Sequence, residues 1–217
     1  MKKYNIVLFD LDGTLTNPGE GITNSVAYAL KKYGIEVPNK KDLLKFIGPP
    51  LYDSFKMFYD FSEEQSREAI KFYREYYSDK GIYECELYNG IKELLSVLKN
   101  AGKTIALATS KPDFFAVRVL RHYGILEYFD FVGGASEDEK TRGTKEAVIE
   151  YIFKEMNIEN REDVIMIGDR HYDINGAKEF SIDSMGVLYG FGTREELEKA
   201  GATYIAEDTE AIKKILL

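Results

Sequence analysis

The feature that most constrains this chain is a short apolar run that ends abruptly in acidic residues. Residues 4–9 are followed at once by Asp10-Leu11-Asp12-Gly13. Because the run is short, apolar and followed by a glycine, it predicts a buried β-strand. It is too short for the hydrophobic region of a signal peptide, and no stretch approaches the roughly 20 apolar residues of a membrane-spanning helix. We therefore expect this strand to deliver its acids to the edge of a sheet.

The second half of the chain alternates between helical and strand patterns. Helical periodicity predicts helices at 90–99, 113–123, 145–156 and around 175–180, and a Thr193/Glu196 capping box begins another. Short apolar segments between them predict strands at 104–108, 131–133, 164–167, 184–189 and 203–205. Such alternation is typical of a parallel sheet with both faces covered. We therefore predict an α/β fold with a Rossmann-like parallel sheet.

Residues 18–83 lack this alternation and are helical throughout by pattern. Helices are expected at 22–33, 42–47 and 51–59, and a capping box of Ser62 and Gln65 begins a fourth. Because the first strand belongs to the sheet, this segment is predicted to be an insertion after that strand. The expected domains are an α/β core of residues 1–16 and 86–217 and an all-helical domain of residues 17–85.

Charge and composition exclude several classes of partner. Acidic residues outnumber basic ones by 37 to 29, a net charge of −8, and the chain has no basic tract. It therefore offers no electrostatic reason to bind nucleic acid or an anionic membrane. One cysteine and two histidines exclude a disulfide framework and a cysteine- or histidine-rich metal site. We expect a cytoplasmic protein that is a monomer or a weak homodimer.

Polar residues follow the predicted strands, and the carboxyl ends of parallel strands are where open sheets bind ligands. Four carboxylates, two small hydroxyls and several cations are expected at that edge: Asp10, Asp12, Thr109, Ser110, Lys111, Lys140, Arg142, Lys145, Asp169 and Asp173. Carboxylates this close would repel one another unless a cation lay between them. Oxygen ligands without histidine or cysteine favour Mg²⁺. Hydroxyls and a lysine favour phosphate.

Together these residues predict Mg²⁺-dependent chemistry on a phosphoryl group. One aspartate can act as the nucleophile and form an aspartyl-phosphate. A second aspartate, not ligating the metal through its side chain, can act as general acid and then as general base. At this point the residues alone do not say which aspartate has which role.

Three motifs resemble the signatures of the haloacid dehalogenase superfamily of phosphatases. They are Asp10-Leu11-Asp12-Gly13-Thr14-Leu15-Thr16, Ala108-Thr109-Ser110-Lys111 and Gly168-Asp169-Arg170-His171-Tyr172-Asp173. The helical insertion resembles the cap domain of that family. Within the family, the chain is most similar to the phosphoglycolate-phosphatase-like branch, and this similarity includes the turn Gly48-Pro49-Pro50-Leu51 in the cap. The resemblance spans essentially the whole chain.

The resemblance implies a role for each site residue. Asp10 would be the nucleophile and a Mg²⁺ ligand, and Asp12 the acid/base, with its backbone carbonyl also on the metal. Asp169 would ligate Mg²⁺, and Asp173 would help to hold it, either directly or through water. Thr109 would hold the phosphoryl group, and Leu11, Ser110 and Gly48 would contact the substrate. Lys145 would neutralise the transferring phosphoryl group, with Lys140 as the rival candidate and Arg142 as a possible helper.

The sequence therefore predicts a Mg²⁺-dependent phosphatase that acts on a small phosphate ester through an aspartyl-phosphate. Phosphoglycolate phosphatase-like activity is the leading expectation. The alternatives are 5′-nucleotidase or pyrophosphatase activity on the same scaffold, or a phosphosugar mutase. A non-catalytic phosphate-sensing module ranks last, because such modules lack a cap of this size. Lys111 and His171 are expected to be surface residues.

Overall fold

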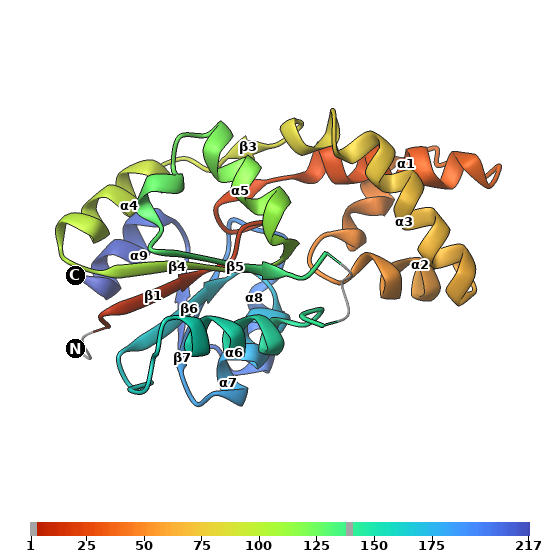
Figure 1. Ribbon diagram of the computed structural model, residues 1–217. Helices are drawn as coiled ribbons and strands as arrows, with labels where there is room; N and C mark the ends of the chain where they lie inside the picture. The colour runs from red at the N-terminus through yellow and green to blue at the C-terminus, as the bar shows by residue number, and fades with distance from the viewer. Residues whose placement is uncertain (1–3, 138–140) are drawn as a thin grey trace. The chain divides into compact units, whose positions relative to one another are not determined.

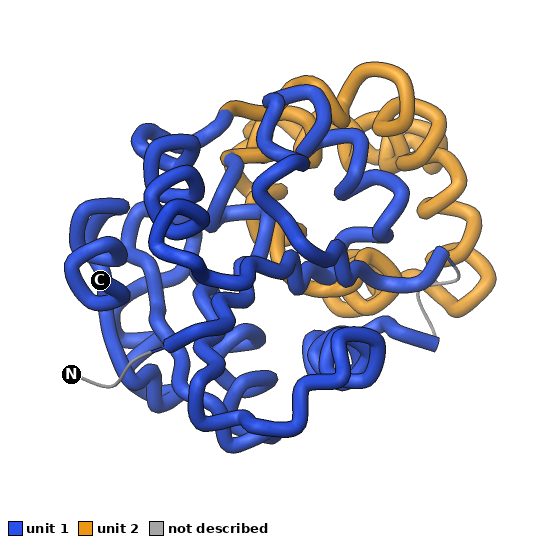
Figure 2. Tube along the Cα trace, turned by 60° about the vertical axis from the view of Figure 1, so that its left-hand side comes forward, with its two compact units in different colours: residues 1–16, 87–217 blue, residues 17–86 orange. Residues whose placement is uncertain are grey.

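The computed structural model describes residues 4–137 and 141–217. The chain divides into two compact units, which Figure 2 distinguishes by colour. The first unit is Met1–Thr16 with Leu87–Leu217, and the second is Asn17–Glu86. The short strands β2 (Thr16–Asn17) and β3 (Glu86–Leu87) pair with each other where the chain passes between the units.

The first unit is built on a parallel sheet, which has six strands within the described residues. In spatial order these are β5 (Phe131–Ala135), β4 (Thr104–Pro112), β1 (Ile6–Phe9), β6 (Val164–Gly168), β7 (Asp183–Val187) and β8 (Tyr204–Ala206). The chain runs outward from β1 to β5 and then returns to β6 on the other side of β1. The carboxyl ends of β1 and β6 therefore flank the switch point, where open sheets of this order bind ligands.

Helices cover the sheet on both faces (Figure 1). On one face lie α4 (Ile91–Asn100) and α5 (Asp113–His122), with α9 (Thr209–Leu216) packed against α4. On the other lie α6 (Lys145–Glu155) and α7 (His171–Glu179), with α8 (Arg194–Ala200) packed against α7. A short 3₁₀ helix, η3 (Leu126–Tyr128), leads into β5. Apolar side chains of α6, such as Ile149 and Ile152, join those of β1, β4 and β6 in one buried cluster.

The secondary structure of the second unit is helical, apart from one residue of β2 and one of β3 at its ends. Its elements are α1 (Gly19–Lys32), η1 (Lys40–Phe46), α2 (Leu51–Tyr59), α3 (Glu63–Tyr77) and η2 (Gly81–Tyr83), with α1 packed on η1 and α3. Aromatic rings form much of its interior: Phe55 lies 5.1 Å from Phe46 and stacks on Phe61 at 5.8 Å, measured between ring centroids. The capping box of Ser62 and Gln65 is present in both directions at the start of α3.

The α/β class with a parallel sheet is confirmed, and the differences from expectation have local causes. The segment expected to be a helix at 42–47 is the 3₁₀ helix η1, which ends just before the Gly48-Pro49-Pro50 turn. β4 continues four residues beyond Ala108, and α7 starts at His171 instead of near Asn175. Strands β2 and β3 were not expected, since two-residue strands carry no periodicity. Helix α9 was not expected either. Within the described residues, no helix has the length and apolar character needed to cross a membrane.

Candidate active site

The loop after β1 is a tight turn that places Asp10 and Asp12 at the switch point. The Leu11 carbonyl accepts hydrogen bonds from the amides of Leu15 and Thr16, both at 2.9 Å, and Gly13 donates to the Thr16 carbonyl at 2.7 Å. Gly13 has a φ of +92°, and a Cβ atom there would overlap the Asp169 carboxylate. The turn therefore needs glycine for both its backbone angle and its close approach to the acid from β6.

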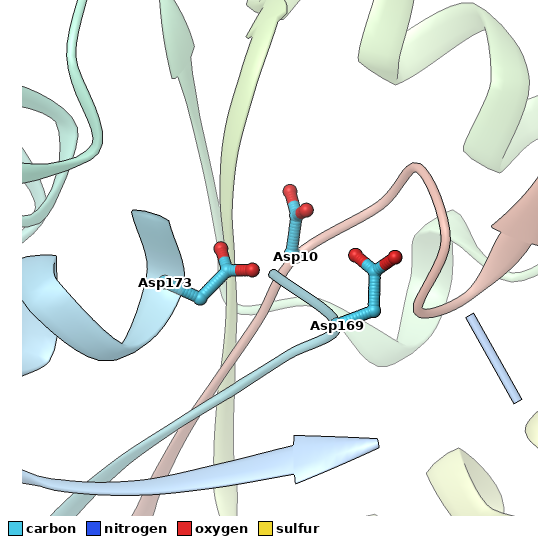
Figure 3. A group of neighbouring side chains, drawn as sticks. All are labelled: Asp10, Asp169 and Asp173. Carbon is cyan, nitrogen blue, oxygen red and sulfur yellow. The ribbon is translucent and has the colours of Figure 1, made fainter. Parts of the chain in front are cut away.

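Three carboxylates gather at this edge of the sheet (Figure 3). Asp10 follows β1, Asp169 follows β6, and Asp173 lies in the first turn of α7. Their exposed fractions are 6%, 0% and 1%, and one carboxylate oxygen from each lies within 4.8 Å of the others. Buried like charges at this spacing require a compensating cation.

Lys145 supplies part of that compensation. Its Nζ forms ion pairs with Asp10 Oδ1 at 2.9 Å and with Asp173 Oδ1 at 2.8 Å. It also donates a hydrogen bond to the Ala108 carbonyl at 2.8 Å. The Thr144 side chain caps α6 by accepting from the Ala147 amide, which fixes the helix start that carries Lys145. Although burial alone would lower it, the neighbouring carboxylates raise the pKa of Lys145 above its ordinary value.

One lysine does not neutralise three carboxylates, and the pKa values of two of these acids are raised. Burial, together with Asp173 and Asp10, raises the pKa of Asp169 well above its ordinary range. Burial also raises the pKa of Asp173 to about 6, against the opposing effect of Lys145. Asp169 Oδ2 accepts from the Phe191 amide, but its Oδ1 is buried with no hydrogen-bond partner among the described residues. An unpartnered carboxylate oxygen beside two other acids fits a hard divalent cation.

Asp12 is paired with a lysine that we expected at the surface. Lys111 is 9% exposed, and its Nζ lies 2.6 Å and 2.8 Å from the two carboxylate oxygens of Asp12. The prediction for Lys111 is therefore wrong, because β4 continues past Ala108 and carries this side chain inward. Burial raises the pKa of Asp12, and Lys111 opposes the rise. An acid that keeps its proton more readily is suited to general acid catalysis.

The threonine of the second motif lies in the same region. Thr109 is buried, and its hydroxyl accepts a hydrogen bond from the Lys111 amide at 3.2 Å, which leaves the hydroxyl proton available to donate. The side chains of Thr109 and Ser110 could instead have capped the next helix, but Pro112 occupies the cap position of α5 and no side chain caps it. Ser110 is partly exposed on β4.

The other candidate residues either bind other parts of the protein or have site roles that remain predictions. The Arg142 guanidinium donates to the Gly134 carbonyl and to Asp113, and His171 pairs with Glu196 at the start of α7. The Leu11 side chain is fully buried, so its predicted substrate contact would have to come from the backbone. Gly48 lies in the second unit and Lys140 outside the described residues, and their roles remain untested.

From the raised pKa of Asp173 we predict how the stability of the metal-free protein changes with pH. Because the fold binds this proton more tightly than the unfolded chain does, ionising Asp173 removes stability as the pH rises from about 4 to about 6. We expect Asp173→Asn, which keeps an oxygen for the Arg170 amide, to gain stability over wild type at about pH 7 and to gain little at about pH 4. Thermal melts in a chelator measure this. Equal differences at both pH values would contradict it, and Asp79→Asn serves as the exposed control.

A parallel sheet of this order with buried acids at its switch point defines a doubly wound α/β protein with a candidate metal site. Residues 7–187 match the family described as haloacid dehalogenase-like hydrolase. The chain therefore belongs to this family, which confirms the resemblance of its motifs.

Relatives with several different names each cover 92% or more of the chain. A 5′-nucleotidase of Pseudomonas aeruginosa is 41% identical, covering 99% of this chain and 96% of its own. A tyrosine-protein kinase of Mycobacterium tuberculosis is 36% identical over 92% of this chain and 67% of its own. A phosphoglycolate phosphatase of Vibrio vulnificus is 29% identical over 100% of this chain and 97% of its own. The crystal structure of a "predicted phosphatase" from Clostridium acetobutylicum is 49% identical, with a TM-score of 0.95 over 99% of both chains.

Proposed function

We propose that the protein is a Mg²⁺-dependent phosphatase that hydrolyses a small phosphomonoester through an aspartyl-phosphate on Asp10. The observation that carries this proposal is the cluster of three buried carboxylates, two of them paired with Lys145, in which Asp169 Oδ1 has no hydrogen-bond partner among the described residues. The relatives named as a nucleotidase and a phosphatase support it. The helical residues 17–85 would be the cap, and residues 1–16 and 86–217 the catalytic core.

The proposed metal ligands are the side chains of Asp10, Asp169 and Asp173 and the backbone carbonyl of Asp12. When bound, Mg²⁺ would offset the charge of these acids and of the substrate phosphate, as a Lewis acid does in phosphoryl transfer. Lys145 is the proposed second source of positive charge at the phosphate, because its Nζ already lies against Asp10. Thr109 is proposed to donate its hydroxyl proton to a phosphate oxygen.

Asp10 is the proposed nucleophile. One of its carboxylate oxygens attacks phosphorus, and the bond between phosphorus and the ester oxygen breaks. The departing alcohol oxygen takes a proton from Asp12, which leaves Asp12 ionised and able to accept a proton from water. That water then attacks phosphorus, the bond to Asp10 breaks, and inorganic phosphate is released. The two steps return both aspartates to their starting protonation states.

Replacing Asp12 by asparagine tests its proposed role. We expect kcat to fall by about 10²- to 10⁴-fold, the usual contribution of a general acid–base. Mg²⁺ binding should persist, because the proposed Asp12 ligand is a backbone carbonyl. The measurement is turnover of p-nitrophenyl phosphate with Mg²⁺ and after chelation, beside a titration of Mg²⁺ binding. Unchanged turnover in the variant would rule out the acid/base role, and unchanged turnover after chelation would rule out the metal.

The substrate class is the second part of the proposal. Nucleoside 5′-monophosphates rank first, because the relative at 41% identity is named a 5′-nucleotidase, and phosphoglycolate ranks below them. A panel of nucleoside monophosphates, phosphoglycolate, sugar phosphates and pyrophosphate, compared by kcat/KM, decides between them. A phosphosugar mutase would be recognised by an isomerised sugar phosphate without release of inorganic phosphate.

A further inference from the structure

The loop between β7 and α8 packs against the acid-bearing edge of the sheet, although the motifs gave it no role. It contains Tyr189-Gly190-Phe191-Gly192 and lies between Val187 and Arg194. Its contacts reach the two neighbouring loops that carry the acids, the one after β1 and the one after β6. These contacts link the loop to both acid-bearing segments of the sheet edge.

The first set of contacts fixes the Asp169 carboxylate. The Phe191 amide donates to Asp169 Oδ2 at 2.8 Å, while Oδ1 is buried and has no hydrogen-bond partner among the described residues. One oxygen is therefore held by the protein, and the other is left for a ligand. An amide donor also favours the ionised carboxylate, which is the form that binds a cation.

Glycines make the close approach possible. A Cβ atom on Gly190 would overlap the Asp169 side chain and the Gly13 carbonyl, and a Cβ atom on Gly192 would overlap the Asp169 carbonyl. In the turn after β1, a Cβ atom on Gly13 would overlap the Asp169 carboxylate. Three glycines from two loops thus converge on one aspartate, which leaves it little freedom to change rotamer.

The second set of contacts ties the same loop to the turn after β1. The Tyr189 hydroxyl donates to the Thr14 carbonyl at 3.0 Å, and the Tyr189 ring packs against Tyr88 with centroids 4.9 Å apart. The loop therefore holds Asp169 and the Asp10–Thr16 turn together.

We propose that residues 189–192 are a positioning clamp that orients Asp169 toward the metal and ties it to the turn after β1. The proposal rests on the proposed function, since it assumes that Asp169 is a Mg²⁺ ligand. Outer groups that orient a metal ligand commonly contribute about 10- to 100-fold to metal affinity. No residue of the clamp needs to contact the substrate.

Gly190→Ala is the direct test, because its added methyl group would displace Asp169 without removing a ligand. We expect the dissociation constant for Mg²⁺, measured by isothermal titration with the metal alone, to rise by about 10-fold or more. The matched control is Gly102→Ala, at φ +75° with no atom within 4 Å of the added Cβ. That variant is strained in its backbone but far from any such contact, so its Mg²⁺ affinity should match wild type. A Gly190→Ala affinity within about twofold of wild type would overturn the clamp.

A second measurement on the wild-type protein covers the case in which Gly190→Ala does not fold. Adding Mg²⁺ should slow hydrogen exchange in the peptide covering 189–192, because the metal fixes the carboxylate that the Phe191 amide binds. Unchanged exchange in a protein that binds Mg²⁺ would overturn the clamp and leave the metal site intact. If the wild-type protein binds no Mg²⁺, the proposed metal site fails and the clamp fails with it.

Discussion

Asp10→Asn is expected to abolish phosphomonoester hydrolysis, with kcat lowered by about 10⁴-fold or more. An amide oxygen is too weak a nucleophile to form the acyl-phosphate, and the remaining acid–base and phosphate-binding groups cannot replace that step. The variant should still fold, because Asp173 keeps its ion pair with Lys145 at 2.8 Å. The measurement is single-turnover release of phosphate, together with trapping of labelled phosphoryl-enzyme in the wild type.

Asp79→Asn is the matched control, since Asp79 is an exposed aspartate of the second unit. It should hydrolyse the substrate at the wild-type rate. If Asp10→Asn turned over substrate at the wild-type rate, Asp10 could not be the nucleophile. Loss of turnover without any phosphoryl-enzyme in the wild type would instead favour direct attack by water.

Lys145→Met is expected to cost both stability and activity. Methionine has a similar length and no charge, so the buried carboxylates of Asp10 and Asp173 would lose their shared cation. Breaking a buried ion pair from one side typically destabilises a fold by about 3–5 kcal/mol. We expect kcat to fall by about 10²- to 10³-fold as well, since a preorganised charge at the phosphate is lost. Denaturant melts in a chelator and steady-state kinetics measure the two effects.

A control and a double variant separate these two effects. Lys154→Met lies on the same helix, and its exposed side chain should change neither quantity. Adding Asp173→Asn to Lys145→Met removes one of the unpaired carboxylates, so stability should partly return while activity stays low. Equal stability of Lys145→Met and wild type would contradict the structural account of the cluster.

The motifs after the strands allowed all three acids of the buried cluster to be predicted. Asp10, Asp169 and Asp173 each follow or lie just beyond the carboxyl end of a predicted strand, and parallel strands bring those ends to one edge. Helix starts were predictable where a side chain caps the backbone, as at Ser62 and Thr193. Two-residue strands and the exact end of β4 were not, because a local pattern does not define them.

The misplacement of Lys111 has a specific cause. A lysine after a strand is usually solvated, and nothing local indicates that Asp12, 99 positions away, lies 2.6 Å from its Nζ. The role of the loop after β7 was missed for the same reason. Its glycines are ordinary turn residues by pattern, and their contact with Asp169 arises from packing between separate segments.

By itself, the sequence determined the class of fold, the order of the acids and the chemistry that oxygen ligands favour. Those properties depend on local periodicity and on the geometry common to all parallel sheets. The tertiary structure decided the pairing: Lys145 between Asp10 and Asp173, Lys111 on Asp12, and the Phe191 amide on Asp169. Pairing is decided there because it depends on distances of a few ångströms between side chains and amides from separate elements, which only the packed sheet and its loops define.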